Sequence, residues 1–156
     1  RPSMTGGGGE YVSDMIALPE LSETAILDNL SCGYARDLIY TAVGPVLVSV
    51  NPFKRLPDAY GAALIEQYTR DAQSLPPHVY GVAAAACTNM RTWAKSQSIL
   101  VSGESGAGKT EVSKSILSFV AAQSARSGGA GDGTLEERIL EANPLLEAFG
   151  NARTVR

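Results

Sequence analysis

The sequence predicts an α/β fold, and two regions of the chain carry that prediction. In the first, an apolar run at residues 98–102 is typical of a buried strand, a glycine-rich run follows at 103–110, and apolar side chains then recur at helical spacing. In the second, β-branched runs between residues 38 and 50 are split by Gly44-Pro45, which predicts two strands joined by a tight turn. We therefore expect a partial sheet with flanking helices, completed by further strands of a larger sheet.

The N-terminal part is expected to hold a tail and one helix before the first strand. Residues 1–9 are polar and end in four glycines, so we interpret them as a flexible tail or linker and residues 10–156 as one domain region. Ser22 precedes an apolar helical pattern and predicts the N-cap of a helix that runs to about Arg36. Gly33 weakens its last turn.

Two further helices are predicted between the hairpin and the glycine-rich run. The first covers residues 58–70, and the second runs from His78 to about Lys95. The inward side chains expected on the first helix are Leu64, Ile65 and Tyr68. Those expected on the narrow, alanine-rich face of the second are Val79, Val82, Ala83, Ala86 and Met90. The aromatic residues interpreted as core are Tyr34, Trp93 and Phe149.

The C-terminal part is expected to hold a helix, a loop and a second helical stretch. The helix begins at Lys109 and ends near Gln123. Residues 124–133 are rich in glycine and serine and predict a surface loop. A last helical stretch begins after Thr134 and is interrupted by a proline at Pro144.

Composition excludes several classes of function. The chain has 156 residues and a net charge of −3, with lysine and arginine scattered along it, so nucleic acid is not expected as a partner. Cys32 and Cys87 lie far apart without metal-ligand spacing, which indicates reduced thiols in a cytosolic protein. No apolar run approaches the length of about 18 residues that would indicate a membrane span.

The glycine-rich run, GESGAGKT at residues 103–110, has the pattern of a loop that holds phosphate. Glycines let the backbone turn tightly, and the helix start that follows offers N–H groups at the positive end of the helix dipole. Lys109 adds a point charge for the β- and γ-phosphates of a nucleotide, and the Thr110 hydroxyl can ligate Mg²⁺. The alternative is a chance match in a glycine-rich chain, which the strand and helix patterns on either side disfavour.

The residues around this loop narrow the prediction. QSILVSGESGAGKTE at residues 97–111 resembles the phosphate loop of the myosin motor head. YTAVGPVLVSVNPFK at 40–54 resembles the strand and purine-binding loop of that family, and PHVY at 77–80 matches the helix that follows. NPLLEAFGNARTV at 143–155 resembles the segment that leads into switch I. The resemblance extends from about Asp14 to the end of the chain, and it implies a phosphate-loop NTPase type of α/β fold.

Carried over residue by residue, the resemblance implies an ATP site with Mg²⁺. The residues at the triphosphate would be Gly103, Glu104, Ser105, Gly106, Ala107, Gly108, Lys109, Thr110 and Glu111, with Thr110 as the metal ligand. The residues at the adenine would be Asn51, Pro52, Phe53 and Lys54, with Tyr60 closing the pocket. An aromatic ring and a proline-fixed turn make a flat apolar wall for a purine, and an asparagine can donate or accept at its edge.

Some of these residues also have plainer interpretations. Asn51-Pro52 can simply end a strand. Because a carboxylate beside a triphosphate suffers like-charge repulsion, Glu104 and Glu111 are interpreted as orienting or hydrogen-bonding groups and not as general bases. His78 is interpreted as a structural residue at a helix start. The loop at 124–133 falls where myosins carry a variable loop near the nucleotide, or it is a plain connector.

The sequence departs from the family pattern at several positions. One extra residue separates Tyr60 from Pro57, which puts its adenine contact in question. The other departures are Gly33 where arginine is usual, Ala42 where an aromatic residue is common, Ala84 where aspartate is common and Cys87 where tyrosine is common. None of these positions belongs to the phosphate loop.

The resemblance implies the ATP-binding part of an actin-based cytoskeletal motor that couples ATP hydrolysis to movement on actin filaments, with light chains on a neck. We expect an N-terminal piece of the motor domain, in the cytoplasm and on the cytoskeleton, that ends just before switch I. It would lack switch II and the actin-binding surfaces, so no catalytic set is complete and the piece is not a competent ATPase alone. The alternatives are a non-enzymatic fragment and another phosphate-loop enzyme, such as a kinesin-like motor or a nucleotide kinase.

Overall fold

The computed structural model describes residues 11–126. The chain divides into two compact units, and each is described by itself. The N-terminal unit contains residues 1–57 and 76–78, and the helical unit contains residues 58–75 and 79–156. All helices and strands reported below lie within the described part of the chain.

Helix α1 (Glu23–Tyr34) begins where the sequence predicts it. The Ser22 hydroxyl accepts a hydrogen bond from the Ala25 N–H at 3.3 Å, so Ser22 is the N-cap as expected. Gly33 lies against Tyr11, and a Cβ at this position would be 2.8 Å from the Tyr11 ring. This close approach gives a physical reason for glycine at this position.

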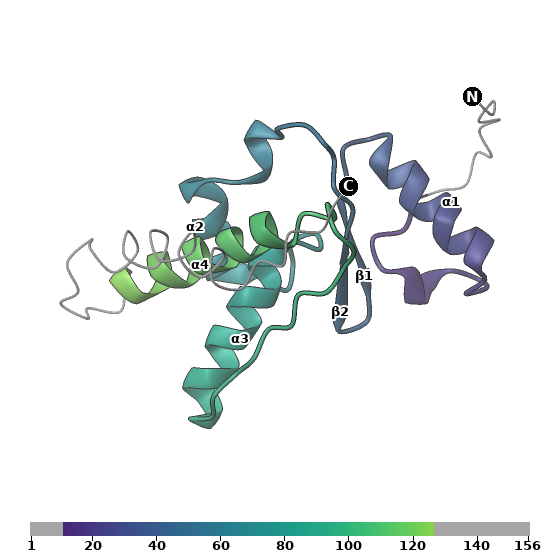
Figure 1. The fold of residues 1–156 in the computed structure, drawn as a ribbon. Helices are drawn as coiled ribbons and strands as arrows, with labels where there is room; N and C mark the ends of the chain where they lie inside the picture. The colour runs from purple at the N-terminus through teal and green to yellow at the C-terminus, as the bar shows by residue number, and fades with distance from the viewer. Residues whose placement is uncertain (1–10, 127–156) are drawn as a thin grey trace. The chain divides into compact units, whose positions relative to one another are not determined.

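The predicted hairpin is confirmed. Strands β1 (Tyr40–Val43) and β2 (Val46–Ser49) pair antiparallel and form a two-stranded sheet (Figure 1). Val43 pairs with Val46, so Gly44 and Pro45 make the tight turn between the strands. Within residues 11–126 these two strands pair only with each other and with a single bridge at Asp14, and the completion of a larger sheet stays a prediction.

A short segment before α1 supports the hairpin. The Ala42 N–H donates to the Ser13 carbonyl at 2.8 Å. The Asp14 carboxylate accepts hydrogen bonds from the Ile16 N–H at 3.0 Å and from the Gly44 N–H at 3.2 Å. Asp14 therefore caps the 3-10 helix η1 (Met15–Ala17) and stabilises the hairpin turn at the same time.

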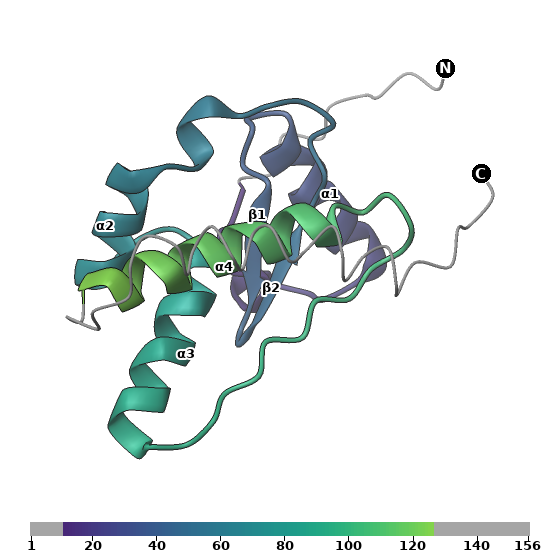
Figure 2. The same ribbon diagram turned by 60° about the vertical axis from the view of Figure 1, so that its left-hand side comes forward.

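The helical unit is built from α2 (Ala62–Asp71), α3 (Val79–Trp93) and α4 (Lys109–Arg126). Helix α4 packs across α3, and α2 contacts both (Figures 1 and 2). The sequence predicted α2 as one helix from residue 58. Instead a 3-10 turn η2 (Pro57–Ala59) comes first, because Gly61 has a φ of 142°, outside the helical region.

The helical unit has an aromatic cluster in which Tyr68, Tyr80 and Phe119 are buried and Tyr60, at its edge, is exposed. Phe119 is fully buried, and the Tyr80 ring stacks on it with centroids 5.4 Å apart. The edges of Tyr60 and Tyr68 each approach Tyr80 at 6.2 Å. Tyr80 of α3 therefore connects the three helices, because its ring contacts Tyr68 of α2 and Phe119 of α4.

The buried face of α3 differs from the predicted one. Its buried residues are Val79, Tyr80, Ala83, Ala84 and Cys87. Met90 was expected inside but is 48% exposed. The helix is turned so that Tyr80, its largest side chain in the first turn, faces Phe119 of α4, and the residues one and two turns further along on that side are buried with it.

Two predictions of core aromatic residues are wrong. Trp93 is 67% exposed, because the C-terminal end of α3 projects beyond α2 and α4 (Figures 1 and 2). Tyr34 is 41% exposed. Phe149, the tail at residues 1–9 and the helical stretch predicted after Thr134 lie outside the described residues.

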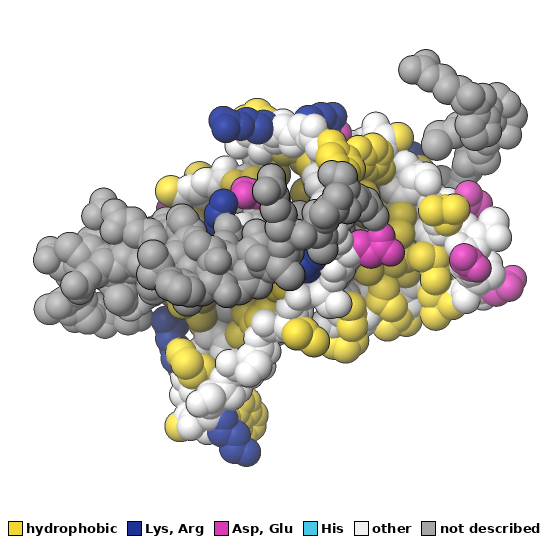
Figure 3. Space-filling view, viewed as in Figure 1, with side chains coloured by type: hydrophobic (Ala, Val, Ile, Leu, Met, Phe, Trp, Pro, Cys, Tyr) yellow, Lys and Arg dark blue, Asp and Glu magenta, His cyan; other side chains and the backbone are white. Residues whose placement is uncertain are grey.

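Hydrophobic side chains also lie at the surface of the N-terminal unit, over α1 and the hairpin (Figure 3). Ile16, Leu27 and Val46 are each more than half exposed. Within residues 11–126, no helix combines the length and the apolar character needed to cross a membrane.

Candidate functional site

The loop at residues 103–110 turns sharply into the N-terminus of α4. Gly106 has a φ of 82° and Gly108 a φ of 94°, a region of backbone conformation that other residues rarely adopt. The Ala107 N–H donates to the Glu104 carbonyl at 3.2 Å, which closes the turn. Residues 102–106 are exposed, so the loop is neither extended nor sealed from solvent.

Lys109 lies within this loop. Its Nζ donates to the Gly103 and Glu104 carbonyls, each at 2.8 Å. The side chain therefore folds back from the first residue of α4 and places its ammonium group at the mouth of the loop. A positive charge in this position is available to an anion that approaches the loop.

The first turn of α4 carries two more of the predicted residues. Thr110 follows Lys109 and is exposed. Glu111 is also exposed, and its carboxylate accepts a hydrogen bond from Lys114 Nζ at 3.0 Å. Because this pair lies at i and i+3 on one helix, it orients Glu111 along α4.

The strand predicted at residues 98–102 is absent. The segment is extended, but it forms no ladder with another strand among residues 11–126, and Leu100 is 92% exposed. Apolar composition specifies a buried strand only when a neighbouring strand supplies hydrogen bonds and a covering face. The loop thus has the predicted helix on one side and an unpaired extended segment on the other.

A groove of about 710 Å³ lies in the helical unit and runs along α4 from its first turn to its last. The residues that line it from the α2 side and α3 are Tyr60, Gly61, Ala62, Ile65, Glu66 and Tyr80. The residues that line it from α4 are Glu111, Lys114, Ser115, Ser118, Ala122, Ala125 and Arg126. Grooves of this volume are typical of sites for small organic ligands.

The groove brings together two residues that the sequence placed at the nucleotide, Tyr60 and Glu111. Tyr60 lies on the wall opposite α4 despite the extra residue before it. Sequence reasoning missed Lys114 and Tyr80. Helical spacing could have predicted Lys114 as part of the site, because it lies one turn after Glu111 on the same helix. Tyr80 comes from a separate helix, and no local sequence pattern indicates it.

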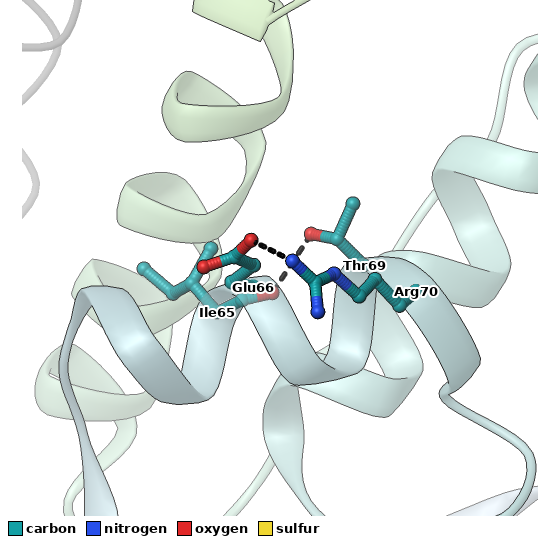
Figure 4. Close-up of polar contacts among 4 residues, drawn as sticks. All are labelled: Ile65, Glu66, Thr69 and Arg70. Carbon is teal, nitrogen blue, oxygen red and sulfur yellow. Dashed lines mark hydrogen bonds and ion pairs between the residues drawn. The ribbon is translucent and has the colours of Figure 1, made fainter.

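The α2 wall of the groove is held by contacts within one helix (Figure 4). Glu66 forms an ion pair with Arg70, one turn further along. The Thr69 hydroxyl donates to the Ile65 carbonyl at 2.7 Å. These contacts orient Glu66, the acidic side chain of this wall, along α2.

Burial raises the pKa of the Tyr80 phenol, which lines the groove. Its pKa is raised above the ordinary value of 10.0, mainly by burial, against a lowering contribution from a backbone hydrogen bond at Gly61, while neighbouring Tyr60 raises it further. Burial also raises the pKa of Tyr68. Both phenols are therefore neutral at physiological pH, and Tyr80 presents an uncharged aromatic surface to the groove.

The other predicted ligand loop, residues 51–54, belongs to the N-terminal unit. The Asn51 side-chain oxygen accepts a hydrogen bond from the Phe53 N–H at 2.9 Å, which makes a compact turn. Phe53 has a φ of 50°, and its ring is 83% exposed. Lys54 Nζ lies 2.6 Å from a carboxylate oxygen of Asp37. The loop thus presents an aromatic ring to solvent from a fixed turn.

His78 has the structural role that its position predicts. It is buried, directly precedes α3, and its ring meets Tyr40 edge-on with centroids 4.6 Å apart. Neither Cys32 nor Cys87 forms a disulfide within residues 11–126, and Cys87 is buried in α3. Within the described range no three His, Cys, Asp or Glu side chains lie together in a way that could hold a metal ion.

Comparisons with known proteins identify the family. The family described as Myosin head (motor domain) matches residues 12–156. Protein OPAQUE1 of Zea mays is 49% identical over 151 residues, which cover 96% of this chain and 10% of that protein. Myosin-17 of Arabidopsis thaliana is 48% identical over 146 residues, 93% of this chain and 10% of that protein. Myosin ID heavy chain of Dictyostelium discoideum is 47% identical over 146 residues, 93% of this chain and 13% of that protein.

The chain is therefore part of a motor protein. It belongs to the myosin head (motor domain) family, as the motif at residues 97–111 predicts. It spans about a tenth of the length of the relatives it matches. The match favours this family over the kinesin-like motor or nucleotide kinase that the phosphate-loop pattern alone left open.

Proposed function

We propose that this chain is the ATP-binding part of an actin-based motor of the phosphate-loop NTPase type. Residues 103–110 hold the triphosphate of ATP, Glu111 orients the first turn of α4 beside it, and Thr110 ligates Mg²⁺. The whole protein couples ATP hydrolysis to movement on actin filaments, in the cytoplasm and on the cytoskeleton, and carries light chains on its neck. Membership of the myosin head family supports ATP as the ligand and actin as the partner of the whole protein.

One observation carries the proposal: a loop with positive φ at Gly106 and Gly108 leads directly into an 18-residue helix, with the Lys109 ammonium at its mouth. Such a loop surrounds a phosphate with backbone N–H groups at the positive end of the helix dipole. In the bound state Lys109 exchanges its two carbonyl acceptors for phosphate oxygens, which are stronger partners because they are charged.

Mg²⁺ fits the Thr110 position. Mg²⁺ keeps several waters and is commonly held by one or two protein groups together with substrate phosphates, so it does not need a cluster of protein ligands. An exposed hydroxyl next to the phosphate loop supplies one such oxygen. The ion would offset the charge of the phosphates that Thr110 faces.

The base of the nucleotide is assigned to loop 51–54 and Tyr60. The exposed Phe53 ring and the Pro52 turn offer a flat apolar wall, and Tyr60 lines the groove beside the start of α4. These assignments rest on the family pattern, residue by residue.

Isothermal titration of the chain with Mg·ATP tests the proposal. The unaltered chain is expected to bind, and Lys109→Ala to bind roughly 10- to 100-fold more weakly, because a hydrogen bond to a charged group contributes about 1.5–3 kcal/mol. Lys95→Ala, which removes an exposed lysine outside the loop, is the matched control. A silent titration with the unaltered chain would favour the alternative of a non-enzymatic fragment.

A further inference from the structure

The end of helix α1 contacts loop 51–54 at two points. The Tyr34 hydroxyl donates a hydrogen bond to the Pro52 carbonyl at 3.2 Å. Asp37 meets Lys54 at 2.6 Å. Both contacts lie within the N-terminal unit, and they reach the loop on either side of Phe53, whose ring is the exposed aromatic surface of the loop.

The helix end that carries these side chains is itself fixed. The Leu38 N–H donates to the Gly33 carbonyl at 2.9 Å, and the Asp37 N–H donates to the Tyr34 carbonyl at 3.1 Å. This pair of bonds is the Schellman arrangement, which places Asp37 at the C′ position in a left-handed conformation with a φ of 60°. The backbone therefore determines where the Asp37 carboxylate lies.

Glycine is the usual residue at that position, because a side chain there adds strain. Aspartate tolerates the conformation better than most residues but still at a cost. Phe53, the residue before Lys54, is a second residue with positive φ and has a large side chain. One strained residue lies within the ion pair and the other lies next to it, which indicates that the local contacts, and not backbone preference, determine the residue types.

We propose that Tyr34 and Asp37 are positioning residues that hold loop 51–54 in the conformation that receives the nucleotide base. This inference rests on the proposed role of that loop. Tyr34 fixes the Pro52 peptide, and Asp37 holds Lys54 away from the Phe53 ring, so that the ring is presented in one orientation. Because neither residue belongs to the phosphate loop, they act on binding of the base and not on binding of the phosphates.

Two conservative variants of the whole chain isolate these contacts. Tyr34→Phe removes only a hydroxyl from a residue that is 41% exposed. Asp37→Asn removes only the charge, and asparagine accepts the left-handed conformation as readily as aspartate, so the helix end is retained. Asp28→Asn, an exposed aspartate on the same helix, is the matched control.

Each variant is titrated with Mg·ATP and with Mg·tripolyphosphate, which has the phosphates but no base. Tyr34→Phe is expected to weaken binding of Mg·ATP by about 2- to 10-fold, the range for the loss of one hydrogen bond. Asp37→Asn is expected to weaken it by about 2- to 5-fold, the range for the loss of one exposed ion pair. Binding of Mg·tripolyphosphate is expected to be unchanged in both. A purely structural defect would weaken both ligands together.

The outcomes separate this inference from the function on which it depends. If both variants keep the full preference of the unaltered chain for Mg·ATP over Mg·tripolyphosphate, the positioning role is overturned while the base-binding role of loop 51–54 stands. If both ligands weaken equally, the positioning role is likewise overturned. If the unaltered chain binds the two ligands equally, the base-binding role itself fails and the positioning role fails with it.

Discussion

The two loops predicted to hold a nucleotide keep their shapes by different means. In loop 103–110 the conformation depends mainly on the main chain. Gly106 and Gly108 form the turn, and Lys109 donates hydrogen bonds to carbonyls of the same loop. In loop 51–54 the turn depends on side chains, one from Asn51 and two from the end of α1. A loop of the first kind is encoded by adjacent residues, whereas one of the second kind depends on tertiary contacts.

The largest expected effect tests how far α4, which begins in loop 103–110, depends on the core of the helical unit. Phe119→Ala removes the fully buried ring on which Tyr80 stacks and leaves a cavity under α4. We expect the free energy of unfolding to fall by about 3–5 kcal/mol, measured by urea titration with circular dichroism. Val120→Ala, on the exposed side of α4, is the control and is expected to cost much less. A small loss for Phe119→Ala would mean that α4 is supported elsewhere.

The next test compares the same chemical change at two glycines. Gly106→Ala adds a Cβ that meets nothing within 4 Å, so its effect is backbone strain at a φ of 82°, expected to destabilise by about 1–2 kcal/mol. Gly81→Ala, in the first turn of α3, makes only ordinary contact with the Tyr68 ring and is expected to stabilise by up to about 0.5–1 kcal/mol. Thermal unfolding of the two variants should therefore shift in opposite directions. Equal shifts would show that the loop does not hold the left-handed turn.

A smaller effect on the free energy of unfolding is expected when the pH is raised, and it depends on two tyrosines of the helical unit. Burial raises the pKa of Tyr80 and Tyr68 above their ordinary value of 10.0. Because the folded-state pKa is the higher one, these phenols contribute their full stabilisation below pH 10, and the contribution is lost as the pH rises through the folded-state values. Urea titrations on both sides of pH 10 should show a fall in stability that Tyr80→Phe and Tyr68→Phe together reduce. An unchanged fall in the double variant would contradict this assignment.

The sequence predicts those features that depend on contiguous residues. Three features follow from local patterns, and the structure has them where expected. They are the Ser22 cap, the hairpin about Gly44-Pro45, and the loop at residue 103 with the helix that begins at Lys109. The myosin family also follows from contiguous motifs. Local patterns identify a loop with its own turn chemistry because the residues that determine it are neighbours in the chain.

The features that the sequence predicts poorly depend on distant partners. The strand at residues 98–102 needs a neighbouring strand that residues 11–126 do not supply. The buried face of α3 is determined by the position of Tyr80 against Phe119, which no periodicity within α3 reveals. Tyr34 was interpreted as core, but its hydroxyl bonds to Pro52 near the surface. In each case tertiary packing overrides the local preference.

If Asp37 positions loop 51–54 as we propose, the left-handed aspartate at the end of α1 implies a trade-off between stability and ligand selectivity. Replacement of Asp37 by glycine would remove the backbone strain at the helix terminus and so raise the free energy of unfolding. It would also remove the carboxylate that forms the ion pair with Lys54. Directed selection for heat tolerance alone would be expected to accept such an exchange at this position. Selection for discrimination among nucleotides would reject it.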